Sequence, residues 1–433
     1  MTVAEMFEQF LNNLSIDNSE QISNRYGEIT RCLNKKYRDT ESKTANSLQV
    51  GSYGRYTAIK GISDLDMIYI MPKSEWERFK DGRQSALLQE VKEAIKDRYS
   101  RTGAWGDGQV VVVSFGNQEI EVLPAFEQED GSFKYPNTNN GGSWPITKPR
   151  SEIKAVSDLD KARNSNLRRL CKMARSWKNK HGVQMGGLLI DTLAYNFLSS
   201  TTEYDDKSYL YYDWMTRDFF KYLSELPDQE YYLAPRSNQR VVVKKKFQSK
   251  AKKAYGLCLT AIEAEGQVGV NNKWKKVFGR PFPAAVTNLS ETAAAKSAIS
   301  WDNTEEFIED TYPIDIRYNL EIDCEVSQNG YREHTLRYML QKHFPLFASK
   351  KLLFHITKID VPEPYHIEWK VLNRGAIAER RNQIRGQIVK DDGSHRKEER
   401  TLFRGPHIVD CYAIRNGVVV AKDRIDVSIE TGE

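Results

Sequence analysis

The sequence predicts an α+β protein in which a mixed sheet is followed by a helical lobe and then by a separate β-rich domain. Short apolar runs typical of buried strands lie between residues 65 and 123, and apolar residues at helical spacing dominate residues 167–262. After residue 316, apolar and polar residues alternate as in half-exposed strands. At 433 residues the chain is long for one hydrophobic core, so more than one domain is expected.

The first residues predict two helices. Apolar residues recur at three- and four-residue spacing from residue 4 to residue 37, with a break at residues 17–19. Each helix therefore has an apolar face, and we expect both helices to back the sheet.

The sheet is predicted from three short apolar runs. Residues 65–71 have the length of a buried strand, and residues 110–115 and 120–123 flank a turn at Gly116-Asn117 that indicates a hairpin. A long helical insert separates the first strand from the hairpin. We assign this mixed α/β region to residues 1–165.

A helical lobe that follows the sheet is predicted at residues 166–290. Apolar residues form one stripe between residues 167 and 177, an apolar helix begins after Gly186-Gly187, and residues 247–262 keep the helical period. Residues 281–300 are rich in Pro, Ala and Ser and predict a linker, which we assign to residues 291–305.

The last part of the chain, residues 306–433, predicts a β-sandwich. Residues 316–326 alternate strictly between apolar and polar side chains. One helix is predicted at residues 335–344. Further strands are predicted at residues 352–356, 367–371, 384–389, 408–414 and 418–421, the last two joined by Asn416-Gly417.

Composition excludes several classes of protein. Hydrophobic residues make up 39% of the chain, and the net charge of +5 is too small to require a nucleic-acid partner. The five cysteines are scattered without a C-x-x-C pair, which indicates neither disulfides nor a zinc site. No apolar run approaches the roughly 18 residues that cross a bilayer, and the first residues lack a basic region followed by an apolar one. We expect a cytoplasmic protein without membrane contact.

Three acidic residues are the strongest candidates for catalysis. Asp64 and Asp66 are separated by one strand residue, so their side chains point the same way. Glu121 lies between Ile120 and Val122, which face the opposite side of their strand. Three carboxylates on one sheet face suit Mg²⁺, with Mn²⁺ as an alternative ion. Two such ions would activate an attacking ribose hydroxyl and stabilise the departing pyrophosphate.

A turn precedes the first two acids and is a candidate for nucleotide binding. Gly51 and Ser52 would let backbone N–H groups and the Ser52 hydroxyl approach a triphosphate closely. Gln49, Arg55 and Thr57 would add polar contacts. Three features occur here in order: the Gly-Ser pair, the two aspartates after it, and a third acid in an apolar strand. This combination is far less expected by chance than any one of the features alone.

Cations are predicted on the helix that begins near residue 167. Lys172 and Arg175 lie opposite its apolar stripe, with Lys178 close by, where they would contact phosphate or base unless this face is only solvated. The densest basic run, residues 244–253, has an apolar face behind it and is interpreted as an outer surface. None of the seven histidines has metal-ligand spacing with a cysteine.

The progression from Gly51-Ser52 through Asp64-Leu65-Asp66 to residues 120–124, Ile-Glu-Val-Leu-Pro, resembles the bacterial cyclic-oligonucleotide synthases, the CD-NTases related to cyclic GMP-AMP synthase and oligoadenylate synthetase. Residues 170–178, 187–191 and 274–283 are similar to the helical half of the SMODS subgroup, so the resemblance covers about residues 5–285.

This resemblance implies a polymerase-beta-like nucleotidyltransferase. Asp64, Asp66 and Glu121 would hold two magnesium ions, Gly51-Ser52 would hold the triphosphate, and Lys172 would contact nucleotide. Many relatives have a serine where this chain has Gly186-Gly187, which leaves that phosphate contact open. The zinc insertion of the animal DNA sensor has no counterpart, so a nucleic-acid activator is not favoured.

The implied activity is the condensation of nucleoside triphosphates, with ATP expected among them, into a cyclic di- or trinucleotide. The product would activate an effector protein in bacterial anti-phage, CBASS-type signalling. Two alternatives stay open. One is transfer of a nucleotide to an RNA, protein or small-molecule acceptor, and the other is a catalytically silent ligand-binding protein.

The C-terminal region resembles the AGS-C module found beside such enzymes, through residues 364–375, 384–386 and 405–407. The resemblance implies a sensor domain. Trp369, Arg385 and His407 could line a ligand site there, although roles in the core and turns of a β-domain are slightly favoured.

Overall fold

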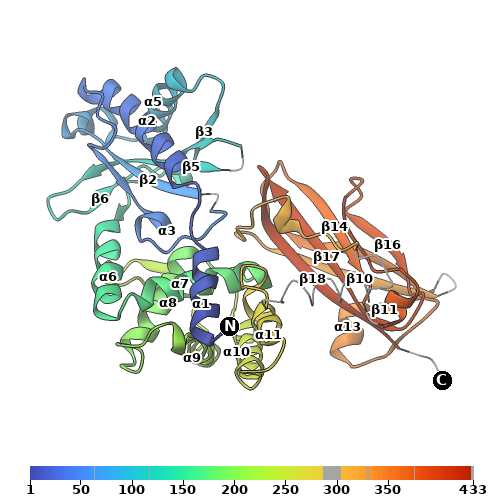
Figure 1. The fold of residues 1–433 in the computed structure, drawn as a ribbon. Coiled ribbons are helices and arrows are strands. Elements are labelled where there is room, and N and C mark those ends of the chain that lie inside the picture. The colour runs from blue at the N-terminus through green and yellow to red at the C-terminus, as the bar shows by residue number, and fades with distance from the viewer. Residues whose placement is uncertain (63, 117, 286–303, 329–330, 375, 431–433) are drawn as a thin grey trace. The chain divides into compact units, whose positions relative to one another are not determined.

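The chain divides into two compact units, Met1–Ala285 and Val286–Glu433 (Figure 1). The computed structural model describes residues 1–62, 64–116, 118–285, 304–328, 331–374 and 376–430. The linker predicted at residues 291–305 therefore lies almost wholly outside the described residues. Thr304 is described and belongs to the C-terminal unit, where its hydroxyl donates a hydrogen bond of 2.6 Å to the Arg385 carbonyl.

The N-terminal unit contains a mixed sheet. Its strands are β1 (Ser47–Gln49), β2 (Asp64–Ile70), β3 (Gly103–Asp107), β4 (Val110–Ser114) and β5 (Glu119–Glu127), with β6 (Phe133–Lys134) and β7 (Ile146–Thr147) continuing from β5. The order is β1–β2–β5–β4–β3, with β2 and β5 parallel and the other neighbours on this path antiparallel. The predicted strand and hairpin are confirmed, apart from Asn117, which lies outside the described residues.

The two N-terminal helices, α1 (Val3–Asn13) and α2 (Ser19–Arg38), pack in different places. α2 backs the sheet together with α5 (Gln84–Arg98), as predicted (Figure 1). The expectation for α1 is wrong, because Phe7 and Phe10 pack against Trp274, Phe278 and Phe282 in the helical half. The aromatic face of α1 matches an aromatic cluster there better than an aliphatic sheet.

The helical half has a single apolar core that contains α1 and the buried Trp177 and Trp274. Its elements are α6 (Pro149–Ala162), α7 (Asn166–His181), α8 (Gly187–Ser199), α9 (Tyr212–Glu225), α10 (Gln248–Ile262), α11 (Val270–Phe278) and the hairpin of β8 (Tyr231–Leu233) and β9 (Arg240–Val242). The lysines among residues 244–253 are all exposed, while Ala251, Ala254 and Cys258 on α10 are buried. This agrees with an outer surface.

The C-terminal unit is a β-sandwich, as predicted. One sheet has the order β11–β10–β13–β16, from β10 (Leu320–Gln328), β11 (Tyr331–Thr335), β13 (Lys351–Ile359) and β16 (Arg396–Arg400). The other has the order β12–β18–β17–β14–β15, from β12 (Leu346–Phe347), β14 (His366–Leu372), β15 (Arg385–Lys390), β17 (Gly405–Arg415) and β18 (Val418–Glu430). One cluster of buried side chains, including Phe354 and Trp369, joins the two sheets.

Two predicted boundaries in this unit are corrected. The strand expected from residue 316 begins at Leu320, because Ile316 packs instead in a small cluster with Ile308 and Tyr412. The helix expected at residues 335–344 is shorter, α13 (Leu336–Gln341), and a further short helix, α14 (Ala376–Arg380), follows β14.

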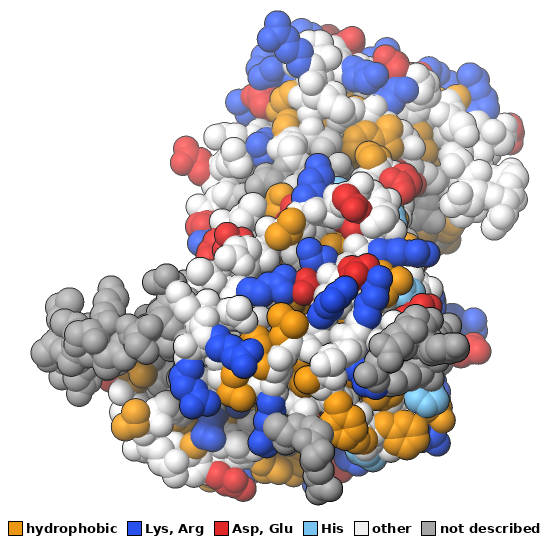
Figure 2. Space-filling model, turned by 90° about the vertical axis from the view of Figure 1, so that its right-hand side faces the viewer, with side chains coloured by type: hydrophobic (Ala, Val, Ile, Leu, Met, Phe, Trp, Pro, Cys, Tyr) orange, Lys and Arg blue, Asp and Glu red, His pale blue; other side chains and the backbone are white. Residues whose placement is uncertain are grey.

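Acidic and basic side chains are interspersed on the face of the molecule drawn in Figure 2. This mixing fits the small net charge of the chain. Among the helices in the described ranges, none has both the length and the apolar composition needed to cross a membrane.

Candidate functional site

The three candidate acids lie on one face of the sheet, where β2 and β5 run side by side. The register places Asp66 opposite Glu121 and Asp64 opposite Glu119. Because residues paired across neighbouring strands share a face, all four side chains project from the same side. Asp64, Asp66 and Glu121 are half-buried, whereas the strand residues between them, such as Leu65, are in the core.

Glu119 is an acid of this face that sequence reasoning missed. It lies two residues before Glu121 on β5, and its side chain is buried. The alternation that selected Glu121 also places Glu119 on the same side, so the signal was present in the sequence.

Carboxylates of this face are the groups that could hold a metal ion, since their oxygens are the ligands that Mg²⁺ prefers. They are not drawn into a closed cage. Across the described ranges, no group of three or more His, Cys, Asp or Glu side chains is close enough to hold an ion.

The Gly-Ser turn begins the short helix α3 (Gly51–Gly54) and lies directly against β2. Gly51 has a φ of +63°, and a Cβ at this position would lie 1.7 Å from Oδ2 of Asp66. The Val50 N–H donates a hydrogen bond of 3.0 Å to the Asp66 carbonyl. Both the backbone conformation and the distance to the carboxylate therefore require glycine at residue 51. Gln49 precedes the turn on β1, paired with Met67.

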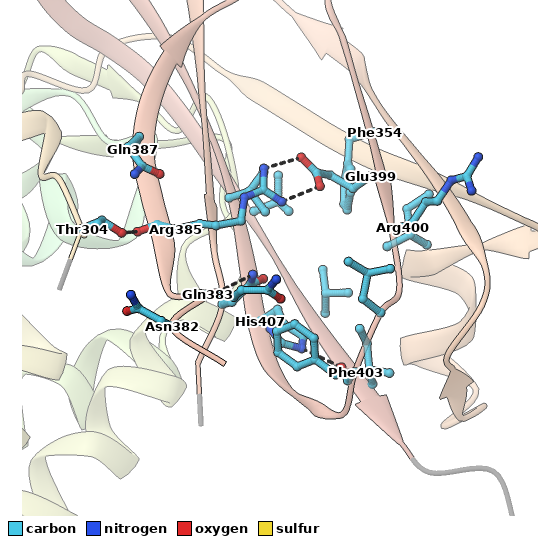
Figure 3. Close-up of a pocket in the computed structure, with 17 residues that line it drawn as sticks. Thr304, Phe354, Asn382, Gln383, Arg385, Gln387, Glu399, Arg400, Phe403 and His407 are labelled. Carbon is cyan, nitrogen blue, oxygen red and sulfur yellow. Dashed lines mark hydrogen bonds and ion pairs between the residues drawn. The ribbon is translucent and has the colours of Figure 1, made fainter. Parts of the chain in front are cut away.

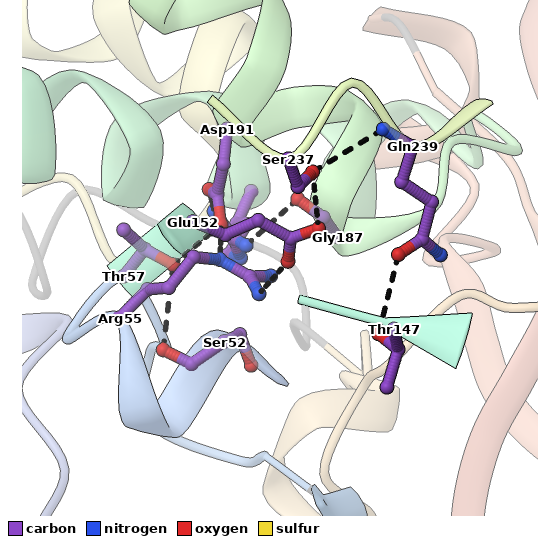
Figure 4. A network of polar contacts seen from close by, with 10 residues as sticks. Ser52, Arg55, Thr57, Thr147, Glu152, Gly187, Asp191, Ser237 and Gln239 are labelled. Carbon is purple, nitrogen blue, oxygen red and sulfur yellow. Dashed lines mark hydrogen bonds and ion pairs between the residues drawn. The ribbon is translucent and has the colours of Figure 1, made fainter. Parts of the chain in front are cut away.

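Three residues that were predicted to contact nucleotide meet at Asp191 of α8 (Figure 4). Arg55 Nε donates to Asp191 Oδ2 at 2.8 Å, and the Thr57 hydroxyl donates to the same oxygen at 2.9 Å. Arg175 Nη1 donates to Asp191 Oδ1 at 2.6 Å. All four side chains are buried, so these polar groups satisfy one another inside the protein.

The charges of this network explain why Asp191 stays ionised. Burial alone would raise the pKa of Asp191, but the Arg175 and Arg55 guanidinium groups outweigh it and lower the pKa to about 2. Glu152 of α6 lies 3.8 Å from Arg55 Nη1 and accepts a hydrogen bond of 2.9 Å from the Ser237 hydroxyl. Burial raises the pKa of Glu152, although Arg55 counteracts it. The network thus ties α6, α7 and α8 to the residues just after α3.

The turn is anchored to this network through its backbone. The N–H groups of Thr57 and Ala58 donate to the Ser52 carbonyl at 2.9 and 3.2 Å. Since Thr57 is also hydrogen-bonded to Asp191, the position of Ser52 depends on the buried carboxylate.

The basic residues of α7 differ in their surroundings. Lys172 is half-buried, and its pKa is lowered by burial and by the nearby charge of Arg168. Arg168 Nε donates to the Arg55 carbonyl at 3.1 Å, and its guanidinium lies 5.0 Å from the centre of the Tyr56 ring. Lys178 is buried one turn beyond Arg175.

Gly187, at the start of α8, lies against Arg175. Arg175 Nη2 donates to the Gly187 carbonyl at 3.1 Å, and a Cβ on Gly187 would lie 3.3 Å from the same nitrogen. Arg175 therefore fills the space beside this helix start.

The structure thus places eight of the predicted residues in two groups. Asp64, Asp66, Glu121, Gly51 and Gln49 surround β2, whereas Arg55, Thr57 and Arg175 surround Asp191. Sequence reasoning gave Asp191 and Glu152 no role. The signal for Asp191 is a lone acid between apolar neighbours on an apolar helix.

A mixed sheet with acids on one face of two adjacent parallel strands, and a Gly-Ser turn against the first, defines a polymerase-beta-like nucleotidyltransferase. The model of the Second Messenger Oligonucleotide or Dinucleotide Synthetase (SMODS) domain matches residues 1–160. The model of the Adenylyl/Guanylyl and SMODS C-terminal sensor domain (AGS_C) matches residues 302–430. The chain belongs to the CD-NTases, the family of cyclic-oligonucleotide synthases, and carries a C-terminal AGS-C sensor domain.

Several solved structures are similar to part of this chain. Escherichia coli MS115-1 CdnC, in a CdnC:HORMA-deltaN complex, matches with a TM-score of 0.51 and 14% identity, over 65% of this chain and 98% of that one. Vibrio cholerae DncV in its GTP-bound form has a TM-score of 0.45 and 14% identity, over 55% and 69% of the two chains. The Rhodothermus marinus CdnE c-UMP-AMP synthase has a TM-score of 0.43 and 13% identity, over 61% and 97%. No curated protein matches the sequence.

Proposed function

We propose that this protein condenses nucleoside triphosphates, ATP among them, into a cyclic di- or trinucleotide with release of pyrophosphate. Asp64, Asp66 and Glu121 are its catalytic acids. The observation that carries the proposal is their common sheet face, with Gly51 held against Asp66. The SMODS match over the same residues supports it.

The donor set fits Mg²⁺, with Mn²⁺ as an alternative. Mg²⁺ commonly takes only one or two carboxylates and completes its coordination with water and substrate phosphates. Two bound ions would activate the ribose hydroxyl and stabilise the leaving pyrophosphate. Three residues would hold these ions. Asp66 and Glu121 are paired across β2 and β5, and Asp64 lies two residues before Asp66 on the same face of β2.

The other predicted contacts divide by position. The Gly51-Ser52 turn, with Gln49 beside it, would hold the triphosphate, and Lys172 and Lys178 would supply positive charge from α7. Arg55, Thr57 and Arg175 are assigned an indirect role. Their hydrogen bonds to Asp191 hold the end of the turn, so they position substrate groups without contacting them.

The family relationship supports a biological role in CBASS-type defence against phage, in which the cyclic product activates an effector protein. Of the two alternatives, a silent ligand-binding protein is disfavoured because all three acids lie on one face. The other alternative is transfer of a nucleotide to an RNA, protein or small-molecule acceptor. The experiment below distinguishes this transfer from cyclisation.

The test is to incubate the full-length protein with four radiolabelled NTPs and Mg²⁺ or Mn²⁺, treat with phosphatase, and resolve the products. We expect a phosphatase-resistant product that is lost in Asp66→Asn and kept in Asp107→Asn, a matched change at an exposed acid on β3. Omission of single NTPs then identifies the bases.

Two results would count against the proposal. An activity loss below about tenfold in Asp66→Asn would contradict a two-metal site. If label appeared only on an added RNA, protein or small molecule, the activity would be transfer to an acceptor and not cyclisation. If no product formed under any condition, both activities would be contradicted.

A further inference from the structure

The C-terminal unit contains a pocket of about 360 Å³, within the size range of small-molecule sites (Figure 3). Its inner wall is formed by apolar residues of both sheets, Leu352, Phe354, Val371, Val409, Val427 and Ile429. Its outer wall is polar and includes Asn382, Gln383, Arg385, Gln387 and Glu399. An apolar wall with a few polar groups is the usual composition of a ligand site.

His407 of β17 lines this pocket and carries an unsatisfied nitrogen. Its Nε2 lies 3.1 Å from the Phe403 carbonyl, which can only accept, so Nε2 carries the proton. Nδ1 is then an acceptor, and it is shielded from solvent without a hydrogen-bond partner in the described part of the chain. Burial lowers the pKa of His407, which favours the neutral ring. A buried acceptor of this kind is costly unless a donor reaches it.

The charge of Arg385 at the pocket is balanced by Glu399, while Arg400, which follows Glu399 on β16, points to the opposite side of its strand. Arg385 donates two hydrogen bonds to Glu399, of 2.6 and 2.8 Å, in a bidentate pair. A phosphate group would meet the Glu399 carboxylate together with the arginine. The geometry therefore favours a neutral ligand over an anionic one.

The amides at the pocket favour a particular shape of ligand. Asn382, Gln383 and Gln387 each carry a donor and an acceptor side by side. Phe354 and Phe403 contribute aromatic side chains to the lining. A flat ring with adjacent donors and acceptors on its edge, the chemistry of a nucleobase, matches both sets of groups.

We propose that this pocket binds a neutral nucleoside, whose base lies on the apolar wall and donates a hydrogen bond to His407 Nδ1. The residues of the pocket all belong to the C-terminal unit, so the proposal does not rest on the catalytic assignment. Of the three residues considered from the sequence, Arg385 and His407 line the pocket. Trp369 does not, since it is buried in the sandwich core with its Nε1 bonded to Asp391 at 2.9 Å.

Calorimetric titration of the full-length protein without divalent cations tests this, using adenosine, guanosine, cytidine and uridine and their 5′-monophosphates. We expect saturable binding of at least one nucleoside, and no tighter binding of its monophosphate. In His407→Phe that binding weakens by about tenfold or more, because the acceptor is lost while the ring is kept. His355→Phe is the matched control, since His355 follows Phe354 on β13 and points to the opposite side of the sheet.

Gln387→Ala is a second pocket variant. Gln387 is exposed, so this test does not depend on whether the variant of the buried histidine folds. It should also weaken nucleoside binding. The proposal is overturned if no nucleoside binds, if both pocket variants bind as the wild type does, or if Asp66→Asn abolishes the binding. The last result would place the nucleoside on the catalytic face, and loss of NTP turnover alone would leave this proposal intact.

Discussion

Two acidic regions of the N-terminal unit are built in opposite ways. On the sheet face, Asp64, Asp66 and Glu121 are half-buried carboxylates of like charge that are not gathered into a closed site. Asp191 is buried and receives hydrogen bonds from two arginines and a threonine. Asp191 is therefore enclosed by the charges that neutralise it, whereas the three acids of the sheet face stay partly exposed. We infer that the first arrangement serves the architecture of the fold and that the second suits the binding of cations.

Asp191→Asn should give the largest effect that follows from this comparison. The change leaves Arg55 and Arg175 buried without their shared counter-charge, and breaking a buried pair in this way costs about 3–5 kcal/mol. We expect a loss of this order in the free energy of unfolding, measured by urea denaturation of the full-length protein. Asp66→Asn is the control and should unfold at the same or a slightly higher urea concentration, because it removes like-charge repulsion.

The effect of Asp191 should also depend on pH. Its pKa of about 2 in the folded protein lies below the value of about 3.9 in an unfolded chain. Asp191 therefore stabilises the protein fully above about pH 4, and this contribution is lost as the pH falls towards 2. The difference between wild type and Asp191→Asn should be constant from pH 6 to 8 and shrink below about pH 4. Equal losses for Asp66→Asn and Asp191→Asn would break the comparison.

The sequence predicted those parts of the site that depend on local spacing. The two-residue period of a strand was enough to place Asp64 and Asp66 on one side of β2. The same period places Ile120 and Val122 on the side of β5 opposite to Glu121. The contacts of Arg55 and Arg175 with Asp191 were not predictable in this way. Asp191 is far from Arg55 in sequence, and the packing of α7 and α8 brings it between the two arginines.

The fold shows the same limit. Helices and strands with an apolar period were predicted, whereas β16 was missed because Arg396–Arg400 contains only charged residues. β16 lies at the edge of its sheet, where it pairs with β13, and edge strands commonly carry charge. The position of α1 was missed because its apolar period does not reveal which apolar surface it covers.

Gly51→Ala tests how closely the turn depends on the catalytic face. A Cβ on Gly51 would clash with Asp66 Oδ2 at 1.7 Å, and the φ of +63° is unfavourable for alanine. Gly82→Ala is a matched control, since Gly82 has a φ of +70° but nothing within 4 Å of its added Cβ. Both changes should lower stability by about 1 kcal/mol through the backbone.

Only Gly51→Ala should lower product formation, by about tenfold or more, because it displaces either the turn or the Asp66 carboxylate. Steady-state assays with NTPs and thermal melts of both variants separate the two effects. A similar loss of activity in Gly82→Ala would remove the assigned link between the turn and Asp66.

Asp213 offers the smallest test and sharpens the comparison with Asp191. It is buried at the start of α9, as Asp191 is buried on α8, but Glu265 is among its neighbours where Asp191 has two arginines. Burial raises the pKa of Asp213 to about 6, and the charge of Glu265 adds to this despite the hydrogen bond from the Trp214 N–H. The pKa of Asp213 is therefore higher in the folded protein than in the unfolded chain. Asp213 makes its full contribution to stability below about pH 4, and this contribution is lost as the pH rises through 6.

Asp213→Asn should therefore raise the melting temperature at pH 7.5 by about 2–4 °C, the shift that accompanies roughly 1 kcal/mol in a domain of this size. The advantage should decline below pH 6 and disappear by about pH 4, where the wild-type carboxyl is itself neutral. Asp206→Asn, at an exposed acid, is the control and should change neither value. A gain that is the same at pH 4 and pH 7.5 would show that packing, and not the buried charge, distinguishes Asp213 from Asp191.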